Sequence, residues 1–208
     1  MTDLQIEVFA DLWCPFTHVG LRAAAALRQE LGRGDVVLRV RPWPLELVNG
    51  APMDPAKAAH NADELRRQVA PGLFAHVDIA HFPTSTLAGL ALVEAAYRRG
   101  PRAGERASFV LRDALFEQGR DLSDPAVLAV LAAELDVAEV SDEDRGAVLG
   151  SWEEGRRRGV LGSPHFFCGG FDSFCPSLSI TREGAAMAVE RSQAALREFL
   201  AACLRPKD

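Results

Sequence analysis

The amino-terminal part of the chain predicts a strand, a helix and a second strand in close succession. Apolar residues alternate with other residues over 4–10, as they do along a pleated strand. A Leu- and Ala-rich stretch from Pro15 to Leu31, ended by Gly32, predicts a helix. The β-branched run from Val36 to Val40, followed by prolines, predicts another strand. Such a βαβ unit joins parallel strands by a right-handed crossover, so we expect an α/β fold.

Cys14 stands between the first predicted strand and the first predicted helix, directly before Pro15. A thiol at a helix start faces unpaired backbone N–H groups and the positive end of the helix dipole. In redox proteins these groups lower a cysteine pKa from about 8.5 to about 3.5–7.5. The position therefore predicts a thiolate nucleophile at the carboxyl edge of the sheet, where open α/β sheets place their sites. The alternative is a small buried hydrophobe, the role of most free cysteines.

The middle of the chain, from Asp54 to Arg158, predicts helices only. N-cap residues before prolines, a run that resembles a capping box, and apolar residues at helical spacing all recur there. The segments concerned are Asp54-Pro55, 84–99, 105–118, Asp124-Pro125 and 141–144. We therefore expect a helical insertion.

The carboxyl-terminal part predicts a return to β structure. Two glycines separate 165–168 from 171–175, which favours a hairpin because a type I′ turn needs positive φ at both central residues. The segment from Arg182 to Leu204 predicts an amphipathic helix. The order βαβ, helical insertion, ββα predicts a thioredoxin fold. We expect a thioredoxin-like domain formed by 1–50 and 159–208, and an insertion domain over 51–158.

Charge and cysteine content exclude several functions. The formal net charge of -6 argues against a nucleic-acid partner or an anionic membrane surface. No secretion signal and no apolar run of membrane-spanning length is present, so we expect a cytoplasmic protein. The four cysteines form no Cys-x-x-Cys pair and do not alternate with histidine at zinc spacing. We expect neither a disulfide scaffold nor a metal site.

Two motifs carry a resemblance that spans most of the chain. Residues 11–20, Asp-Leu-Trp-Cys-Pro-Phe-Thr-His-Val-Gly, resemble the Asp-x-Trp-Cys-Pro-Trp-Cys-Tyr-x-Gly active-site segment of DsbA-like thioredoxin-fold proteins. Residues 159–167 are similar to that family's Gly-Val-x-Gly-Val-Pro-x-Phe segment, whose proline is cis. The branches concerned are FrnE and 2-hydroxychromene-2-carboxylate isomerase, which also carry a helical insertion. The resemblance implies that Cys14 is catalytic and that Pro164 is a cis-proline beside it.

Thr17 marks the departure from the family, because it stands where the second active-site cysteine is found. An intramolecular disulfide cannot form through this motif, so a mixed disulfide on Cys14 needs another thiol to release it. The Thr17 hydroxyl is expected to donate a hydrogen bond to the thiolate. The alternative is that Thr17 marks an inactive site.

The resemblance also suggests which residues surround the substrate. The backbone of Ser163, beside Pro164, would pair with a bound peptide or thiol tripeptide. Other candidates for the substrate site flank Cys14 or Pro164 in the sequence: Trp13, Pro15, Phe16, His18 and His165. His18 lies one helical turn from Cys14 and is a candidate to stabilise the thiolate, although a pocket-wall role fits it equally. The segment 81–85 is a candidate lid or pocket wall.

The remaining cysteines have different expected roles. Cys175 is a candidate resolving thiol for Cys14, which requires Cα atoms within about 7 Å of each other. Its alternative is an ordinary loop cysteine. We expect Cys168 and Cys203 to be part of the core.

Three functions remain open. The first is a monothiol-type thiol-disulfide oxidoreductase acting on a small-molecule thiol or protein disulfide, with no tightly bound cofactor. Glutathione, mycothiol or a similar low-molecular-weight thiol would release Cys14. The second is a glutathione-dependent transferase or isomerase resembling the kappa class, whose members usually carry serine where Cys14 stands. The third is a non-catalytic binding protein. The resemblance leaves a homodimer open.

Overall fold

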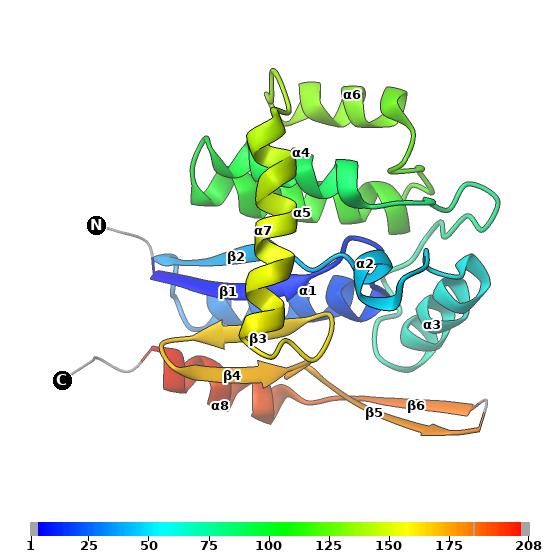
Figure 1. The fold of residues 1–208 in the computed structure, drawn as a ribbon. Helices are drawn as coiled ribbons and strands as arrows, with labels where there is room; N and C mark the ends of the chain where they lie inside the picture. Colours follow the sequence, from blue (N-terminus) through cyan, green and yellow to red (C-terminus); the bar gives the residue numbers. More distant parts are fainter. Residues whose placement is uncertain (1–3, 185, 205–208) are drawn as a thin grey trace.

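The computed structural model describes residues 4–184 and 186–204, and a four-stranded sheet lies at its centre (Figure 1). The strands are β1 (Leu4–Ala10), β2 (Val36–Pro42), β3 (His165–Cys168) and β4 (Phe171–Phe174), in the spatial order β2-β1-β3-β4. β1 is parallel to β2 and antiparallel to β3, and β3 and β4 form a hairpin. Strands from the two ends of the chain therefore meet at the β1–β3 pair, which confirms the predicted order of the sheet.

The described residues contain eight helices. They are α1 (Pro15–Glu30), α2 (Leu45–Asn49), α3 (Pro55–Gln68), α4 (Leu87–Tyr97), α5 (Pro101–Phe116), α6 (Pro125–Glu134), α7 (Asp142–Arg157) and α8 (Gln193–Cys203). In Figure 1, α7 crosses one face of the sheet, whereas α1 and α8 lie against the other. None of these helices is long and apolar enough to cross a membrane. The α/β class and the helical insertion are thus confirmed.

Local capping signals place the starts of three helices as predicted. The Asp54 side chain accepts a hydrogen bond from the Ala56 N–H, and Asp124 caps α6 in the same way. Ser141 and Asp144 form a reciprocal capping box at the start of α7. These side chains satisfy backbone N–H groups that a helix start leaves without intrahelical partners.

The predicted carboxyl-terminal helix over 182–204 is wrong in its first half. Instead, β5 (Leu178–Glu183) and β6 (Ala186–Arg191) form a separate hairpin, and only α8 is helical. Met187 and Val189 are buried while their neighbours are exposed, which is the period of a strand. Gln68 at the end of α3 fixes β6 from the side, because its amide accepts from Val189 N (2.8 Å) and donates to Met187 O (2.9 Å).

The insertion packs closely on the sheet. One apolar cluster joins α3–α7 to Trp13, Val19 and Cys175. The segment 69–86 between α3 and α4 contains no helix, so the expectation of helices only is wrong there. The division into domains 1–50 with 159–208, and 51–158, stays a prediction.

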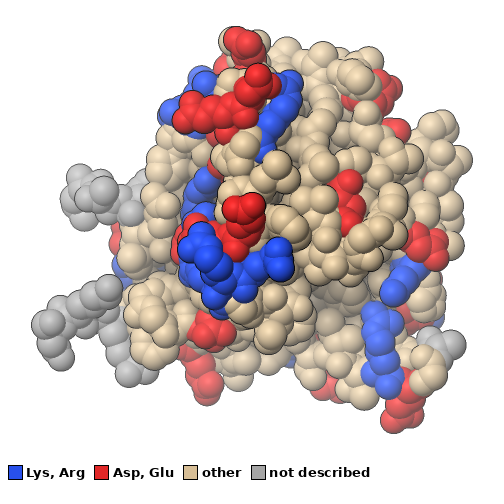
Figure 2. Space-filling view, viewed as in Figure 1, with Lys and Arg blue, Asp and Glu red and all other residues tan. Residues whose placement is uncertain are grey.

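Arginine-rich stretches lie among acidic side chains. Figure 2 shows Lys and Arg interleaved with Asp and Glu on the face that carries α7. Arg158 contacts Glu7 (2.6 Å) and Glu154 (3.2 Å), and Arg41 contacts the same two carboxylates at 2.6 and 2.7 Å. These arginines are therefore neutralised within the protein.

Gly104 in α5 leaves no room for a side chain, because a Cβ there would overlap the Tyr97 ring. That ring is fixed by its hydroxyl, which accepts from Val40 N (2.7 Å) and donates to Leu38 O (3.0 Å). We expect Gly104→Ala to reduce the free energy of unfolding by about 1–3 kcal/mol, although alanine is the better helix former. Gly146→Ala in α7, where nothing lies within 4 Å of the added Cβ, should raise it by about 1 kcal/mol. Urea unfolding of both variants is the measurement, and a gain from both would contradict the steric argument.

Candidate active site

Cys14 is the N-cap residue of α1 and lies at the carboxyl end of β1. The residue is only 4% exposed. Its Sγ donates a hydrogen bond to the Ser163 carbonyl oxygen at 3.1 Å. The pairing of Phe9 with His165 in β1 and β3 brings the segment before β3 to this position. Cys14 and Ser163 are therefore neighbours in space although they are far apart in the sequence.

Ser163 and Thr17 surround Cys14 with hydroxyl groups. The two side-chain oxygens lie 2.7 Å apart, and Ser163 Oγ accepts from Asp11 N at 2.9 Å. Thr17 is fully buried. Its hydroxyl and its backbone N–H both lower the pKa of Cys14 and so favour the thiolate. The Ser163–Pro164 peptide bond is cis.

The pKa of Cys14 contradicts the expectation from the helix start. Burial raises the pKa of the thiol above its ordinary value, and the negative charge of Asp11 adds to this increase. Hydrogen bonds from Thr17 and Ser163 lower the pKa but do not outweigh burial. Removing a group from water disfavours its charged form, and here that effect exceeds the favourable helix start. The resting site therefore holds a neutral thiol, not the predicted thiolate.

Asp11 and Arg112 form a buried polar pair behind Cys14. The Asp11 carboxylate accepts from Leu45 N (2.5 Å) and the Thr86 hydroxyl (2.7 Å), and its backbone carbonyl accepts from Arg112 (2.9 Å). Burial raises the pKa of Asp11 to about 6 despite these hydrogen bonds. Burial also lowers the pKa of Arg112 to about 10. The sequence interpretation quoted Asp11 within a motif without giving it a role, and it missed Arg112.

His18 is engaged by a carboxylate from the end of α5. Its Nε2 lies 2.6 Å from Glu117 Oε1, and its ring packs between Phe74 and Phe116. Burial lowers the pKa of His18. The contact fixes α1 to the insertion. Both expected roles of His18, stabilising the thiolate and forming a pocket wall, stay predictions.

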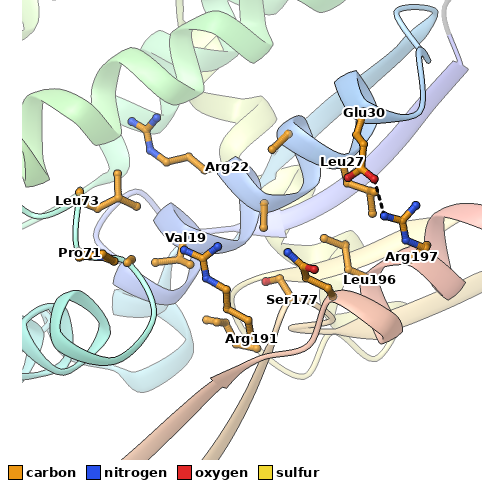
Figure 3. Close-up of a pocket in the computed structure, with 16 residues that line it drawn as sticks. Val19, Arg22, Leu27, Glu30, Pro71, Leu73, Ser177, Arg191, Leu196 and Arg197 are labelled. Carbon is orange, nitrogen blue, oxygen red and sulfur yellow. Dashed lines mark hydrogen bonds and ion pairs between the residues drawn. The ribbon is translucent and has the colours of Figure 1, made fainter.

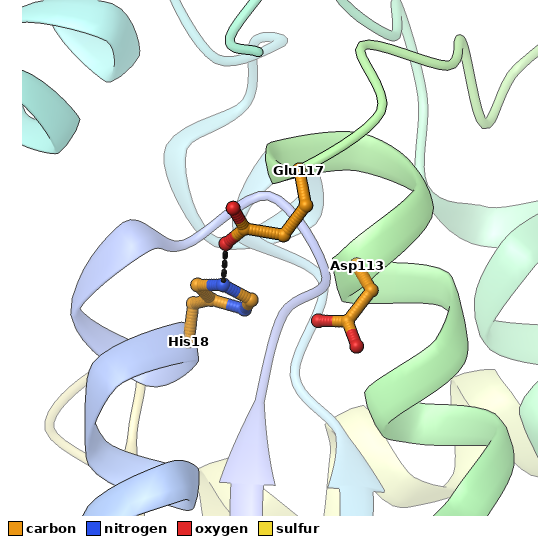
Figure 4. Close-up of side chains that lie close together, drawn as sticks. All are labelled: His18, Asp113 and Glu117. Carbon is orange, nitrogen blue, oxygen red and sulfur yellow. Dashed lines mark hydrogen bonds and ion pairs between the residues drawn. The ribbon is translucent and has the colours of Figure 1, made fainter. Parts of the chain in front are cut away.

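Figure 4 shows His18 directed at Glu117, with Asp113 nearby. Their ligand-type atoms lie within 4.8 Å of one another. The Glu117 carboxylate already accepts from Phe74 N (3.0 Å) and Ala75 N (2.9 Å). Burial raises the pKa of Glu117, but these hydrogen bonds and the one with His18 outweigh burial and lower the pKa to about 2. Asp113 pairs with Arg22. The protein's own donors therefore occupy the cluster, which we assign to structure.

His165 organises the segment that leads into β3. Its Nδ1 accepts from Leu161 N, and its Nε2 lies near Asp172, both at 3.1 Å. Burial lowers the pKa of His165. Both ring nitrogens thus support the backbone that carries Ser163 and Pro164.

Aromatic side chains close the site on the side of the insertion. Trp13 is fully buried and stacks on Phe82, with ring centroids 6.4 Å apart and planes 13° apart. Phe82 belongs to the segment 81–85, whose role as a lid or pocket wall stays a prediction. Pro15 is the first residue of α1, and Phe16 packs on the apolar cluster of the insertion.

Cys175 lies on the opposite side of the cis-proline from Ser163. Its backbone N–H donates to Pro164 O at 2.9 Å, and the residue is 6% exposed. Burial raises the pKa of Cys175 to about 12, and a negative charge on Cys14, when that thiol is ionised, would add to this increase. No disulfide joins Cys14 and Cys175, so the resolving role of Cys175 stays a prediction. Cys168 is buried as expected, and Cys203 is partly buried.

A cysteine at the start of the first helix, faced by a cis-proline before β3, defines a thioredoxin-like site on a thioredoxin-like sheet. The chain belongs to the family described as the DSBA-like thioredoxin domain, whose model matches residues 5–189. This finding confirms the family identified from the motifs.

Solved structures with the same fold have low sequence identity. A protein from Nitrosomonas europaea, provisionally described as a protein disulfide isomerase, is 17% identical (TM-score 0.68, covering 95% of this chain and 96% of that one). The cytosolic disulfide reductase DsbM from Pseudomonas aeruginosa is 16% identical (TM-score 0.63, covering 96% and 98%). A 2-hydroxychromene-2-carboxylate isomerase is 15% identical (TM-score 0.62, covering 82% and 88%). At these identities the likeness shows the fold alone. No match was found among curated proteins.

Proposed function

We propose that the protein is a monothiol-type thiol-disulfide oxidoreductase in which Cys14 is the reactive group. The observation that carries this proposal is the position of the Cys14 thiol at the start of α1, hydrogen-bonded to Ser163 O and beside the cis-proline. Membership of the DSBA-like family supports it. Two proteins with the same fold, a disulfide reductase and a protein provisionally described as a disulfide isomerase, belong to the broader class of thiol-disulfide chemistry.

The proposed reaction uses one protein sulfur and one external thiol. The Cys14 thiolate attacks a disulfide RSSR, forming a Cys14–S–S–R bond and releasing RS⁻, which takes up the proton lost by Cys14. The thiolate of a second thiol, such as glutathione or mycothiol, then attacks the R sulfur. A new disulfide leaves and Cys14 is regenerated, so the external thiol supplies the electrons. We propose that this reaction occurs in the cytoplasm, because the structurally similar reductase DsbM is described as cytosolic.

Deprotonation of Cys14 is the step that the resting structure disfavours. The thiol proton is directed at the Ser163 carbonyl, which is also the group proposed to pair with a substrate. A substrate that takes this carbonyl would displace the thiol proton, and the Thr17 hydroxyl and backbone N–H, which lower the pKa of Cys14, would then favour the thiolate. Thr17 is therefore the proposed positioning residue for the thiolate.

The neutral thiol also favours a second candidate, the glutathione-dependent transferase or isomerase. In such an enzyme residue 14 would stay protonated and donate a hydrogen bond to the thiolate of bound glutathione. The Cys14 side chain already acts as a donor, to Ser163 O. In a glutathione-dependent enzyme of this kind, a serine hydroxyl could replace the Cys14 thiol as the donor.

The test is reduction of hydroxyethyl disulfide, with glutathione and mycothiol as separate reductants. We expect turnover by the wild type, its loss in Cys14→Ser, and a roughly tenfold lower rate in Thr17→Val, which lacks the hydroxyl that lowers the pKa of Cys14. Cys203→Ser is the matched control and should keep full activity. A glutathione-dependent activity retained in Cys14→Ser would favour the transferase or isomerase. An absence of turnover with every thiol tested would contradict both enzymatic functions and favour the third hypothesis, a non-catalytic binding protein.

A further inference from the structure

A cavity of about 460 Å³ lies between α1, α8 and the segment 70–73 (Figure 3). Neither Cys14 nor Thr17 lines it. Its volume falls within the range of about 300–1,000 Å³ that is typical of small-molecule sites. Aliphatic side chains form much of its wall, among them Val19, Ala23, Leu27, Pro71, Leu178 and Leu196. The cavity therefore suits a ligand with an apolar body.

Arg191 supplies a positive charge that no described carboxylate neutralises. Its guanidinium donates to the Val69 carbonyl, through Nε at 2.8 Å and also through one terminal nitrogen. The other two cations on the cavity wall differ in this respect, because Arg197 pairs with Glu30 and Arg22 pairs with Asp113. In Figure 3 the Arg191 side chain extends toward Val19 beneath α1. Arg191 is thus available to an anion.

Ser177 supplies a hydroxyl that lacks a partner. The residue is only 4% exposed and lines the cavity, yet its Oγ has no hydrogen-bond partner among the described residues. A buried polar group without a partner is rare, because it loses its bonds to water without replacement. Gly20 provides the space beside it, since a Cβ on Gly20 would lie 3.1 Å from the Ser177 oxygen.

The β5–β6 ladder brings these two groups together. Leu178 is the cross-strand partner of Arg191, and Ser192 N donates to Ser177 O at 2.9 Å. Ser177 and Arg191 therefore lie at the same end of the hairpin, and both residues line the same cavity (Figure 3). Arginine with a neighbouring hydroxyl is a suitable pair of donors for a carboxylate.

We propose that this cavity binds an amphipathic carboxylate, such as a medium-chain fatty acid. Arg191 and Ser177 donate hydrogen bonds to the carboxylate, and the hydrocarbon chain lies on the aliphatic wall formed by α1 and α8. The site involves no covalent step and does not depend on Cys14 chemistry.

Calorimetric titration of the full chain with hexanoate, octanoate and decanoate tests the apolar part of the proposal. Affinity should rise about fourfold for each methylene that the wall covers. Decanol, which has the same chain without the charge, should bind about tenfold more weakly than decanoate. Equal affinity of decanol and decanoate would overturn the role of the anion.

Substitutions inside and outside the cavity test whether decanoate binds there. Ala23→Phe fills it and should abolish decanoate binding, whereas Ala25→Phe, on the same helix outside the cavity, should not change it. Arg191→Gln should weaken binding about tenfold and Arg191→Lys should retain most of it. Unchanged binding in Ala23→Phe would overturn the proposal. Displacement of decanoate by glutathione would also overturn the proposal, because the cavity would then be a binding site for the tripeptide. Cys14→Ser should bind decanoate normally, which separates this test from the redox proposal.

Discussion

Arg112→Leu should reduce the free energy of unfolding by about 3–5 kcal/mol, because it leaves buried acceptors without their donor and removes a positive charge that compensates the buried Asp11 carboxylate. Arg112 is 1% exposed and donates to the Ser108 carbonyl and the Asp11 carbonyl, both at 2.9 Å. Its positive charge also stabilises the buried Asp11 carboxylate. Leucine satisfies none of these acceptors and leaves the Asp11 charge uncompensated. Denaturation by urea near neutral pH measures the effect.

Two further variants identify the cause. Arg106→Leu lies on the same helix but is exposed, and it should change the free energy of unfolding by less than about 0.5 kcal/mol. If charge compensation dominates, Arg112→Leu should cost less in an Asp11→Asn background than in the wild type. An equal cost in both backgrounds would show that Arg112 stabilises the protein through packing alone.

Local signals predicted most of the fold. β1 has the bounds read from its alternating apolar residues, and α3, α6 and α7 begin at the caps that the sequence displays. These signals involve residues within one turn or one strand, so they do not depend on the rest of the molecule. The β3–β4 hairpin follows from two glycines that both have positive φ.

The β5–β6 hairpin shows where local reasoning fails. Val189, Leu196 and Cys203 have a helical spacing, but Val189 belongs to β6 and only the other two to α8. The strand β6 is held in place by hydrogen bonds with Gln68, a residue more than a hundred positions earlier. A single spacing pattern contains no information on such a contact, although Gly184 at φ 61° does mark the turn.

The site shows the same division between local and tertiary effects. The sequence placed Cys14, Thr17, Ser163 and Pro164 in one site, because the family motifs specify their order, and the structure brings them together. The sequence predicted a lowered pKa for Cys14, whereas burial raises this pKa. The favourable helix start is visible in the sequence, whereas the burial that outweighs it arises from the insertion and β3. Arg112 was missed because its spacing from Asp11 has no local meaning.

Asp11→Asn should change how the free energy of unfolding depends on pH. The pKa of Asp11 is raised from 3.8 to about 6, so the folded state binds this proton more tightly than the unfolded state. The stability from this group is therefore fully present below about pH 4 and is lost as the pH rises through about 6. A shift of this size corresponds to about 3 kcal/mol. The free energy of unfolding of the wild type, minus that of Asp11→Asn, should fall by this amount between about pH 4 and 8.

The same variant tests the electrostatic link between Asp11 and Cys14. The Asp11 charge helps to raise the pKa of Cys14, so Asp11→Asn should move the pH midpoint of Cys14 alkylation downward. Mass spectrometry of each peptide resolves Cys14 from Cys203, which serves as the internal control and should not shift. A Cys14 midpoint that stays in place while the pH dependence of stability changes would show that Asp11 acts on the fold and not on the thiol. A shift of both would make the Asp11 carboxyl the group through which pH near 6 controls the reactivity of Cys14.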